Sequence, residues 1–184
     1  MAYIHLILGG ARSGKSFLAE REAIAQANKT SKSLVYLATA QAQDTEMQER
    51  IRRHQQDRGE GWQTIECPIA LIDKLQELKQ QKVVIVIDCL TLWLTNYLCE
   101  LGTDVWQSAK RELNDVLANW QQAEADLLFV SNEVGHGIVP MGELSRQFVD
   151  ESGWLHQDIA KVADKVDFVM AGLALNLKST EGNQ

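Results

Sequence analysis

The stretch "YIHLILGGARSGKS", residues 3 to 16, decides the fold that the rest of the chain is expected to adopt. Its apolar first half, residues 3–8, is typical of a β-strand, and residues 14–28 have the pattern of a helix. Between them, residues 9–16 fit the spacing G-x-x-x-x-G-K-[ST], in which glycines let backbone N–H groups converge on phosphate oxygens. The predicted phosphate-binding loop contains Gly9, Gly10, Ala11, Arg12, Ser13, Gly14, Lys15 and Ser16.

Two side chains of this loop are expected to act on a nucleoside triphosphate. Lys15 should reach the β- and γ-phosphates, and Ser16 should bind Mg²⁺. Proteins with such a loop commonly carry a carboxylate near the metal, at the end of a buried strand. The most apolar run of the chain, "VVIVIDC" at 83–89, supplies Asp88 at that position. Ligands gather at the carboxyl ends of parallel strands, so Asp88 is predicted to be a metal ligand, with a plain strand-end cap as the alternative.

Apolar β-rich runs alternate with helical patterns along the chain. This alternation predicts an α/β fold with a mostly parallel sheet and helices on both faces. With 184 residues and no low-complexity linker, one domain is expected over residues 1–184, with a frayed tail at about 179–184. The strands are predicted at 3–8, 33–39, 62–67, 83–89, 126–132 and 167–172, and the helices at 14–28, 44–58, 69–80, 91–101, 105–124 and 142–163.

Charge and cysteine content exclude several classes of protein. The net charge of −7 argues against unaided binding to nucleic acid, which needs a basic face to neutralise phosphates. The three cysteines lack C-x-x-C spacing, as expected for reduced thiols in a cytoplasmic protein. The N-terminus does not resemble a signal peptide, and no apolar run approaches the length of a membrane span.

A basic segment, "ERIRRHQQDR" at 49–58, places His54 among four arginines of this acidic chain. On a helix, Arg50 and Arg58 would share the face of His54, and Asp57 could orient the imidazole ring. The arginines disfavour a second positive charge and would keep the ring neutral and nucleophilic. They could also stabilise charge during phosphoryl or nucleotidyl transfer. The alternative is a solvated helix face with an incidental histidine.

Six blocks of the sequence together resemble one enzyme family. The arginine-rich block and the N-E-V-G-x-G-I-V-P block are specific to it, whereas the phosphate-binding loop alone is generic. In chain order the blocks are "GGARSGKSFLAE", "YLATA", "DTEMQERIRRHQQDR", "WQTIEC", "IDCLTLWLTN" and "SNEVGHGIVP". They resemble the bifunctional adenosylcobinamide kinase / adenosylcobinamide-phosphate guanylyltransferases of cobalamin biosynthesis, over residues 4 to about 178.

The resemblance implies a P-loop NTPase-like α/β fold, a homotrimer and two reactions. The first phosphorylates the aminopropanol hydroxyl of adenosylcobinamide with ATP or GTP. The second transfers GMP from GTP to that phosphate through a GMP–histidine intermediate. The resemblance implies that His54 is the nucleophile. Relatives often read G-R-x-N-Q where this chain has "GWLHQ" at 153–157, so Trp154 and His156 are expected to alter local packing or corrinoid contacts. The implied nucleotide contacts are residues 9–16, Ala38, Thr39, Ala40, Gln55, Gln56, Asp57, Arg58, Glu66 and Asp88.

Two other functions fit the phosphate-binding loop. A plain small-molecule kinase would use the arginine-rich segment only as a lid and would carry no protein-bound nucleotide. A regulatory module would use NTP hydrolysis as a switch for partner binding and would make no corrinoid product. The fate of the α- and γ-phosphates of GTP separates these two functions from the bifunctional transferase.

Overall fold

A computed structural model describes residues 2–41 and 61–180 of the 184-residue chain. The predicted basic helix at 44–58, which contains His54, lies outside the described residues.

A seven-stranded sheet forms the centre of the molecule, in the order β3-β2-β4-β5-β1-β6-β7. Its first six strands in chain order run parallel, and the seventh pairs antiparallel with the sixth. The predicted mostly parallel sheet is therefore confirmed. The strands are β1 (Ile4–Gly9), β2 (Ser33–Ala38), β3 (Trp62–Glu66), β4 (Val83–Asp88), β5 (Asp126–Asn132), β6 (Lys165–Met170) and β7 (Leu173–Ser179).

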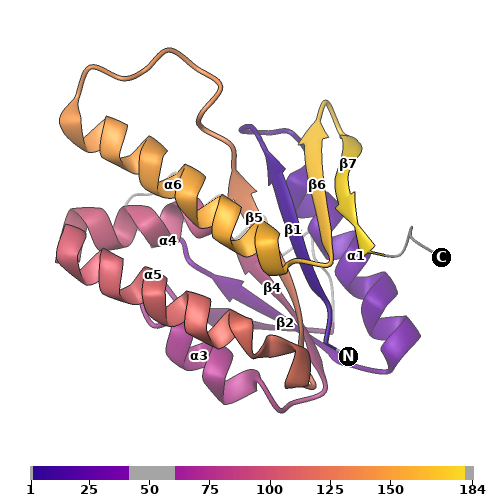
Figure 1. Ribbon diagram of the computed structural model, residues 1–184. Coiled ribbons are helices and arrows are strands. Elements are labelled where there is room, and N and C mark those ends of the chain that lie inside the picture. The colour runs from indigo at the N-terminus through magenta and orange to yellow at the C-terminus, as the bar shows by residue number, and fades with distance from the viewer. Residues whose placement is uncertain (1, 42–60, 181–184) are drawn as a thin grey trace.

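Helices cover both faces of the sheet, as predicted, but unequally in the part of the chain that the structure describes (Figure 1). One face packs against α1 (Lys15–Thr30). The other packs against α3 (Leu71–Leu78), α4 (Leu90–Asn96), α5 (Thr103–Ala118) and α6 (Glu143–Val162). The helices predicted at 91–101 and 105–124 each end in a different helical turn, η1 (Tyr97–Leu101) and η2 (Trp120–Gln122). In these described ranges, no helix is both long and apolar enough to cross a membrane.

Burial on both faces explains the continuous apolar runs of the central strands. In β1, Leu6 packs into the α3–α6 side of the core, and its neighbour Ile7 packs against the α1 side. Successive side chains of a strand point to opposite faces, so a strand covered on both sides needs apolar residues at every position. Trp93 and Trp106 meet edge to face at 5.2 Å between ring centroids on the α3–α6 side.

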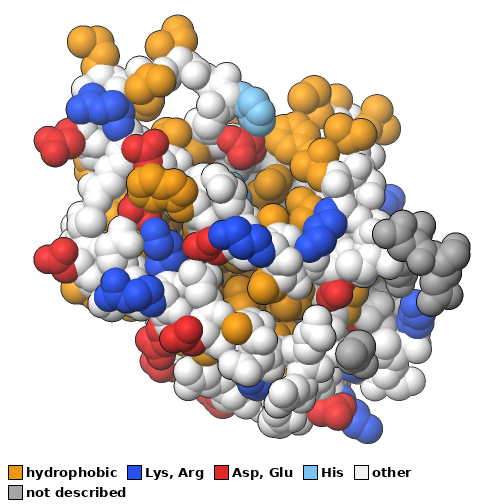
Figure 2. Space-filling view, viewed as in Figure 1, with side chains coloured by type: hydrophobic (Ala, Val, Ile, Leu, Met, Phe, Trp, Pro, Cys, Tyr) orange, Lys and Arg blue, Asp and Glu red, His pale blue; other side chains and the backbone are white. Residues whose placement is uncertain are grey.

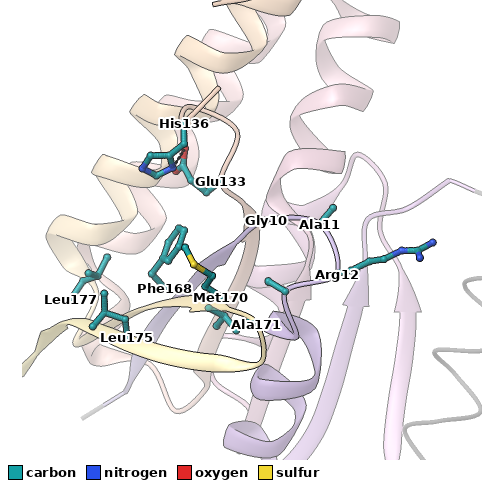
Figure 3. Close-up of a pocket in the computed structure, with 12 residues that line it drawn as sticks. Gly10, Ala11, Arg12, Glu133, His136, Phe168, Met170, Ala171, Leu175 and Leu177 are labelled. Atoms are coloured by element: carbon teal, nitrogen blue, oxygen red, sulfur yellow. Dashed lines mark ion pairs between the residues drawn. The ribbon is translucent and has the colours of Figure 1, made fainter. Parts of the chain in front are cut away.

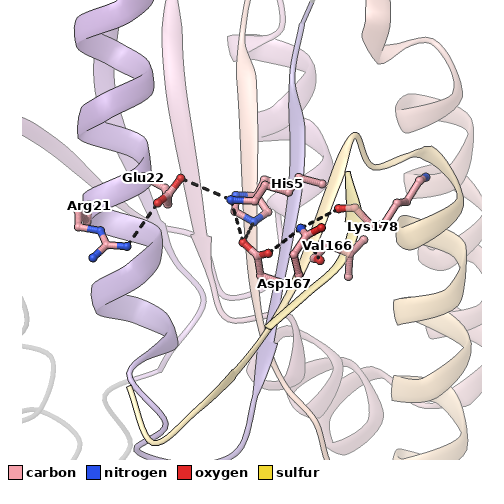
Figure 4. A network of polar contacts seen from close by, with 8 residues as sticks. His5, Arg21, Glu22, Val166, Asp167 and Lys178 are labelled. Atoms are coloured by element: carbon pink, nitrogen blue, oxygen red, sulfur yellow. Dashed lines mark hydrogen bonds and ion pairs between the residues drawn. The ribbon is translucent and has the colours of Figure 1, made fainter. Parts of the chain in front are cut away.

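A buried polar pair joins β1 to β6 (Figure 4). His5 Nε2 lies 2.9 Å from Asp167 Oδ2, and Lys165 Nζ lies 3.0 Å from the same oxygen. A carboxylate only accepts hydrogen bonds, so Nε2 carries the proton of a neutral His5. Burial lowers the pKa of His5 and outweighs the opposing influence of Asp167. His5 is thus a packed polar residue of the sheet.

The edge strand β7 was missing from the sequence prediction. The turn before it has positive φ at both residues, 53° at Ala171 and 78° at Gly172, as a type I′ hairpin turn requires. An Ala-Gly pair lacks the Asn or Asp that usually marks such a turn, so the hairpin carried little signal. Pairing extends to Ser179, and Thr180 N donates to Asp164 O at 2.9 Å. The chain is therefore still ordered at positions 179 and 180, where the frayed tail was predicted to begin.

Candidate functional site

The carboxyl ends of the parallel strands meet along one edge of the sheet. In the register of the strands, Gly9 lies between Asn132 and Val169. Ala38 lies between Asp88 and Glu66. The sheet therefore brings the phosphate-binding loop, the residues after β2, Asp88 and Glu66 to the same edge, where ligands of such sheets bind.

The loop at 9–16 is shaped by close contacts that require glycine at its start. A Cβ atom on Gly9 would lie 2.5 Å from Val169 O and 2.6 Å from Ser13 Oγ, so a larger residue would displace the loop. Gly14 has a φ of 96° at the N-cap of α1 and offers no side-chain cap. The first N–H groups of α1 have no intrahelical partner, so they can bind an anion.

Lys15 and Ser16 open helix α1 directly after the loop. Lys15 is only 8% exposed, and its Nζ donates to Gly10 O at 3.0 Å, so the side chain folds back over the loop. Ser16 is half-buried in the first turn. The backbone of the loop is held from a second element, because Gly172 N in the β6–β7 turn donates to Ser13 O at 2.9 Å.

Asp88 ends β4 with its carboxylate half-buried. The hydroxyl of Tyr36 donates to Asp88 Oδ2 at 2.8 Å. Sequence reasoning missed Tyr36, because this contact depends on β2 and β4 being neighbours in the sheet. The carboxylate retains further lone pairs for a ligand, since its two oxygens together offer about four acceptor sites.

Thr39, in the predicted nucleotide-binding group, is fully buried. Its Oγ1 accepts from Cys89 N and donates to Cys89 O, both at 2.7 Å. Asn96 Nδ2 donates to Thr39 O at 3.0 Å. The Thr39 side chain thus ties the end of β2 to the end of β4, and Ala40 beside it is half-buried. Burial raises the pKa of the Cys89 thiol to about 11, so this cysteine stays protonated at neutral pH.

Six predicted site residues remain. One of them, Glu66, is distant from the loop, and the other five lie outside the described residues. Glu66 is exposed at the end of β3. Four strand spacings separate β3 from β1, a distance of about 19 Å, so Glu66 and the loop mark opposite ends of the site. The five others are His54, Gln55, Gln56, Asp57 and Arg58, and the structure does not describe them.

A cavity of about 610 Å³ lies on the other side of the loop, between the segment after β5 and the β6–β7 hairpin (Figure 3). Figure 2 shows apolar side chains gathered over this hairpin, and Met170, Leu173, Leu175 and Leu177 are exposed there. Sequence reasoning missed this cavity because one of its walls is β7. Its lining consists of Gly10, Ala11, Arg12, Ser13, Glu133, His136, Phe168, Val169, Met170, Ala171, Leu175 and Leu177.

Many solved structures share the fold, and one of them illustrates the likeness. It is an ATPase domain that matches with a TM-score of 0.55 at 13% sequence identity, over 98% of this chain and 78% of the other. At that identity the likeness shows the α/β fold alone.

The relatives in sequence are much closer. The chain is 46% identical over 173 residues to the bifunctional adenosylcobalamin biosynthesis protein CobP of Pseudomonas aeruginosa, covering 94% of this chain and 96% of the relative. It is 36% identical over 183 residues to the bifunctional adenosylcobalamin biosynthesis protein CobU of Escherichia coli, covering 94% and 98%. A family model described as cobinamide kinase / cobinamide phosphate guanyltransferase matches residues 5–177. The resemblance inferred from the sequence blocks is confirmed, and the chain belongs to the cobinamide kinase / cobinamide phosphate guanyltransferase family.

Proposed function

We propose that this protein is a bifunctional enzyme of adenosylcobalamin biosynthesis that acts twice on one acceptor. In the first reaction, the hydroxyl oxygen of adenosylcobinamide attacks the γ-phosphate of ATP or GTP, and the nucleoside diphosphate leaves. The observation that carries the proposal is the loop at 9–16, held between β1 and α1 at the same edge of the sheet as Asp88, in a chain of this family. Its backbone N–H groups and Lys15 would hold the phosphates.

In the second reaction, a ring nitrogen of His54 attacks the α-phosphate of GTP, and pyrophosphate leaves. The phosphate oxygen of adenosylcobinamide phosphate then attacks the GMP phosphorus and displaces the histidine, giving adenosylcobinamide-GDP. The arginines around His54 support the proposal, because positive charge stabilises the transferring phosphoryl group. The nucleotide contacts proposed with them are Ala38, Thr39, Ala40, Gln55, Gln56, Asp57, Arg58, Glu66 and Asp88.

The residues at the loop fit a Mg²⁺ ion bound together with a nucleotide. Ser16 offers a hydroxyl and Asp88 a carboxylate, and hard oxygen ligands are those that Mg²⁺ takes in proteins. Among the described residues no cluster of three acidic, histidine or cysteine ligands occurs, in keeping with an ion held largely by phosphates and water. Bound there, Mg²⁺ would neutralise charge on the phosphates.

Labelled GTP tests the proposed function. With α-labelled GTP and Mg²⁺ the protein should acquire label that mild acid removes, because a phosphoramidate is labile to acid and stable to base. With γ-labelled GTP the protein should stay unlabelled, while added adenosylcobinamide should accept the label. His54→Ala should abolish protein labelling and leave phosphorylation of the acceptor largely intact.

An arginine near the nucleophile serves as a second variant in the same assay. Arg50→Ala should slow labelling by about 10²–10³, the contribution of one well-placed donor, and Arg111→Ala on the exposed side of α5 should not. Acid-labile label in His54→Ala would place the nucleophile elsewhere. Phosphorylation without any protein label would favour a plain kinase, and slow hydrolysis without a corrinoid product would favour a regulatory module.

A further inference from the structure

The cavity beside the phosphate-binding loop contains a single acidic side chain among its described lining residues, Glu133 (Figure 3). The carboxylate stands at the end of β5 next to the loop, since Glu133 N donates to Gly9 O at 3.1 Å. In Figure 3 the Glu133 side chain lies on the cavity side of the loop, while Arg12 extends away from it. An acceptor in this cavity would therefore lie between the loop and one carboxylate.

The Glu133 carboxylate accepts one backbone hydrogen bond and lies close to two histidine rings. Gly135 N donates to Oε1 at 2.5 Å. Oε1 also lies 3.6 Å from Nδ1 of His136 (Figure 3), and Oε2 lies 3.8 Å from Nδ1 of His156 on α6. The side chain is 20% exposed, so the carboxylate is fixed but still accessible from the cavity.

A buried histidine closes the site behind Glu133. His156 Nε2 lies 2.6 Å from Ser131 Oγ, which fixes the ring against β5. Its Nδ1 is buried and has no hydrogen-bond partner within the described part of the chain. Burial lowers the pKa of His156 despite the nearby Glu133 carboxylate, so the ring is neutral at neutral pH. Glu133 therefore faces a neutral His156 ring, and this ring does not neutralise the negative charge of the Glu133 carboxylate.

The opposite wall of the cavity is apolar. Phe168 and Met170 of β6 and Leu175 and Leu177 of β7 form it. A wall of this kind fits the apolar part of an acceptor and displaces water from the reacting atoms. The cavity thus combines a phosphate site, a carboxylate and an apolar surface, which are the parts that transfer of a phosphoryl group to an alcohol needs.

We propose that Glu133 is the general base of the kinase reaction and that this cavity holds the hydroxyl-bearing arm of the acceptor. The acceptor oxygen forms a bond to the γ-phosphorus, the bond from that phosphorus to the β,γ-bridging oxygen breaks, and the nucleoside diphosphate leaves. The hydroxyl proton passes to a carboxylate oxygen of Glu133 and is later released to solvent. This inference rests on the proposed kinase activity and adds to it the residue that accepts the proton.

The test measures the two half-reactions separately in Glu133→Gln, which keeps the shape of the side chain and an oxygen for the Gly135 N–H. Phosphorylation of adenosylcobinamide should fall about 10²–10⁴-fold in kcat, the usual contribution of a positioned base. The KM for ATP should change little. Guanylyl transfer to adenosylcobinamide phosphate supplied ready-made should stay at the wild-type rate, because that acceptor is already an anion and needs no base.

Glu124→Gln is the matched control, because Glu124 is exposed and precedes β5 at the opposite end of the strand. It should leave both half-reactions unchanged. If Glu133→Gln phosphorylates the acceptor within about threefold of the wild-type rate, Glu133 is not the general base, since a positioned base contributes far more. Equal losses in both half-reactions, or weakened ATP binding, would also overturn it and assign Glu133 to the support of the loop. If the wild-type protein becomes labelled on His54 but never phosphorylates the acceptor, the proposed kinase function is contradicted. The assignment of Glu133 as its general base then fails as well.

Discussion

Lys15 is a charged side chain that is buried at the phosphate-binding loop. A lysine is rarely buried unless it is paired, and Lys15 is 8% exposed with its Nζ on Gly10 O. The motif predicts a lysine directed at phosphates, and in the structure the side chain folds back so that Nζ reaches Gly10 O. Removing the charge while keeping the stem should therefore separate binding from folding.

Lys15→Met should weaken GTP binding about 10- to 100-fold, because a hydrogen bond to a charged group contributes about 1.5–3 kcal/mol. Titration calorimetry measures this change. The melting temperature should change little, since the apolar stem keeps its buried place beside the loop. Lys29→Met, in the last turn of the same helix, is the control and should bind GTP like wild type. Unchanged affinity in Lys15→Met would contradict the assignment of the loop.

For single residues of the site, the sequence predicted which residues take part better than it predicted their hydrogen-bond partners. The glycine spacing of the loop follows from its local geometry, so Gly9 and Gly14 could be read directly. The partners of Thr39 and Asp88 could not, because they come from residues far along the chain: Cys89 for Thr39 and Tyr36 for Asp88. Those contacts depend on the order of strands in the sheet, which a single sequence leaves open.

Strands buried on both faces were the elements best predicted from sequence. β1, β4 and β5 lie in the middle of the sheet, so their apolar runs are continuous and unambiguous. β7 escaped prediction for the opposite reason. It is an edge strand whose leucines at 173, 175 and 177 are exposed, and it follows a turn without the usual sequence signature. Because β7 was not predicted, the cavity wall that it forms was not predicted either.

Two buried histidines make the strands and α6 sensitive to acid. Burial lowers the pKa of His5 and of His156 below 6.5, against the influence of Asp167 and Glu133 respectively. Lys165 and Glu22 also act on His5, in opposite directions. The unfolded chain therefore binds protons first as the pH falls. Stability is complete above about 6.5 and decreases below it, toward the lower pKa values of the folded state.

The free energy of unfolding should accordingly fall between pH 7 and pH 5, with a slope of up to about 2.7 kcal/mol per pH unit for two protons. Urea denaturation across this range measures it. His156→Asn should remove about half of the slope. His136→Asn should leave the slope unchanged, because that side chain is exposed. A flat pH dependence in the wild type would contradict the neutral state of both rings.

At the scale of the described molecule, several strongly exposed apolar side chains lie together in the segment after β5. Ile138 is 97% exposed, Met141 96% and Val139 73%, whereas Leu175 and Leu177 of β7 belong to the cavity wall. Apolar surface of this kind marks an interaction site. We propose that it is covered when the protein assembles as a cytoplasmic homotrimer, the state that the family resemblance implies.

Light scattering on the purified protein should give three times the chain mass of 20.6 kDa. Ile138→Asp should shift the protein toward smaller species, because a charge at the centre of an apolar contact must be desolvated. Glu124→Gln again serves as the unaffected control. A wild-type mass equal to a single chain would contradict the trimer.

The two backbone bonds that hold the phosphate-binding loop have a consequence for regulation. Gly9 O accepts from Glu133 N, and Ser13 O accepts from Gly172 N, so both walls of the cavity are joined to the loop. Anything that alters the loop when a nucleotide binds also alters the cavity. Thermodynamic linkage makes such an influence mutual. The factor by which ATP changes the affinity for the acceptor must equal the factor by which the acceptor changes the affinity for ATP.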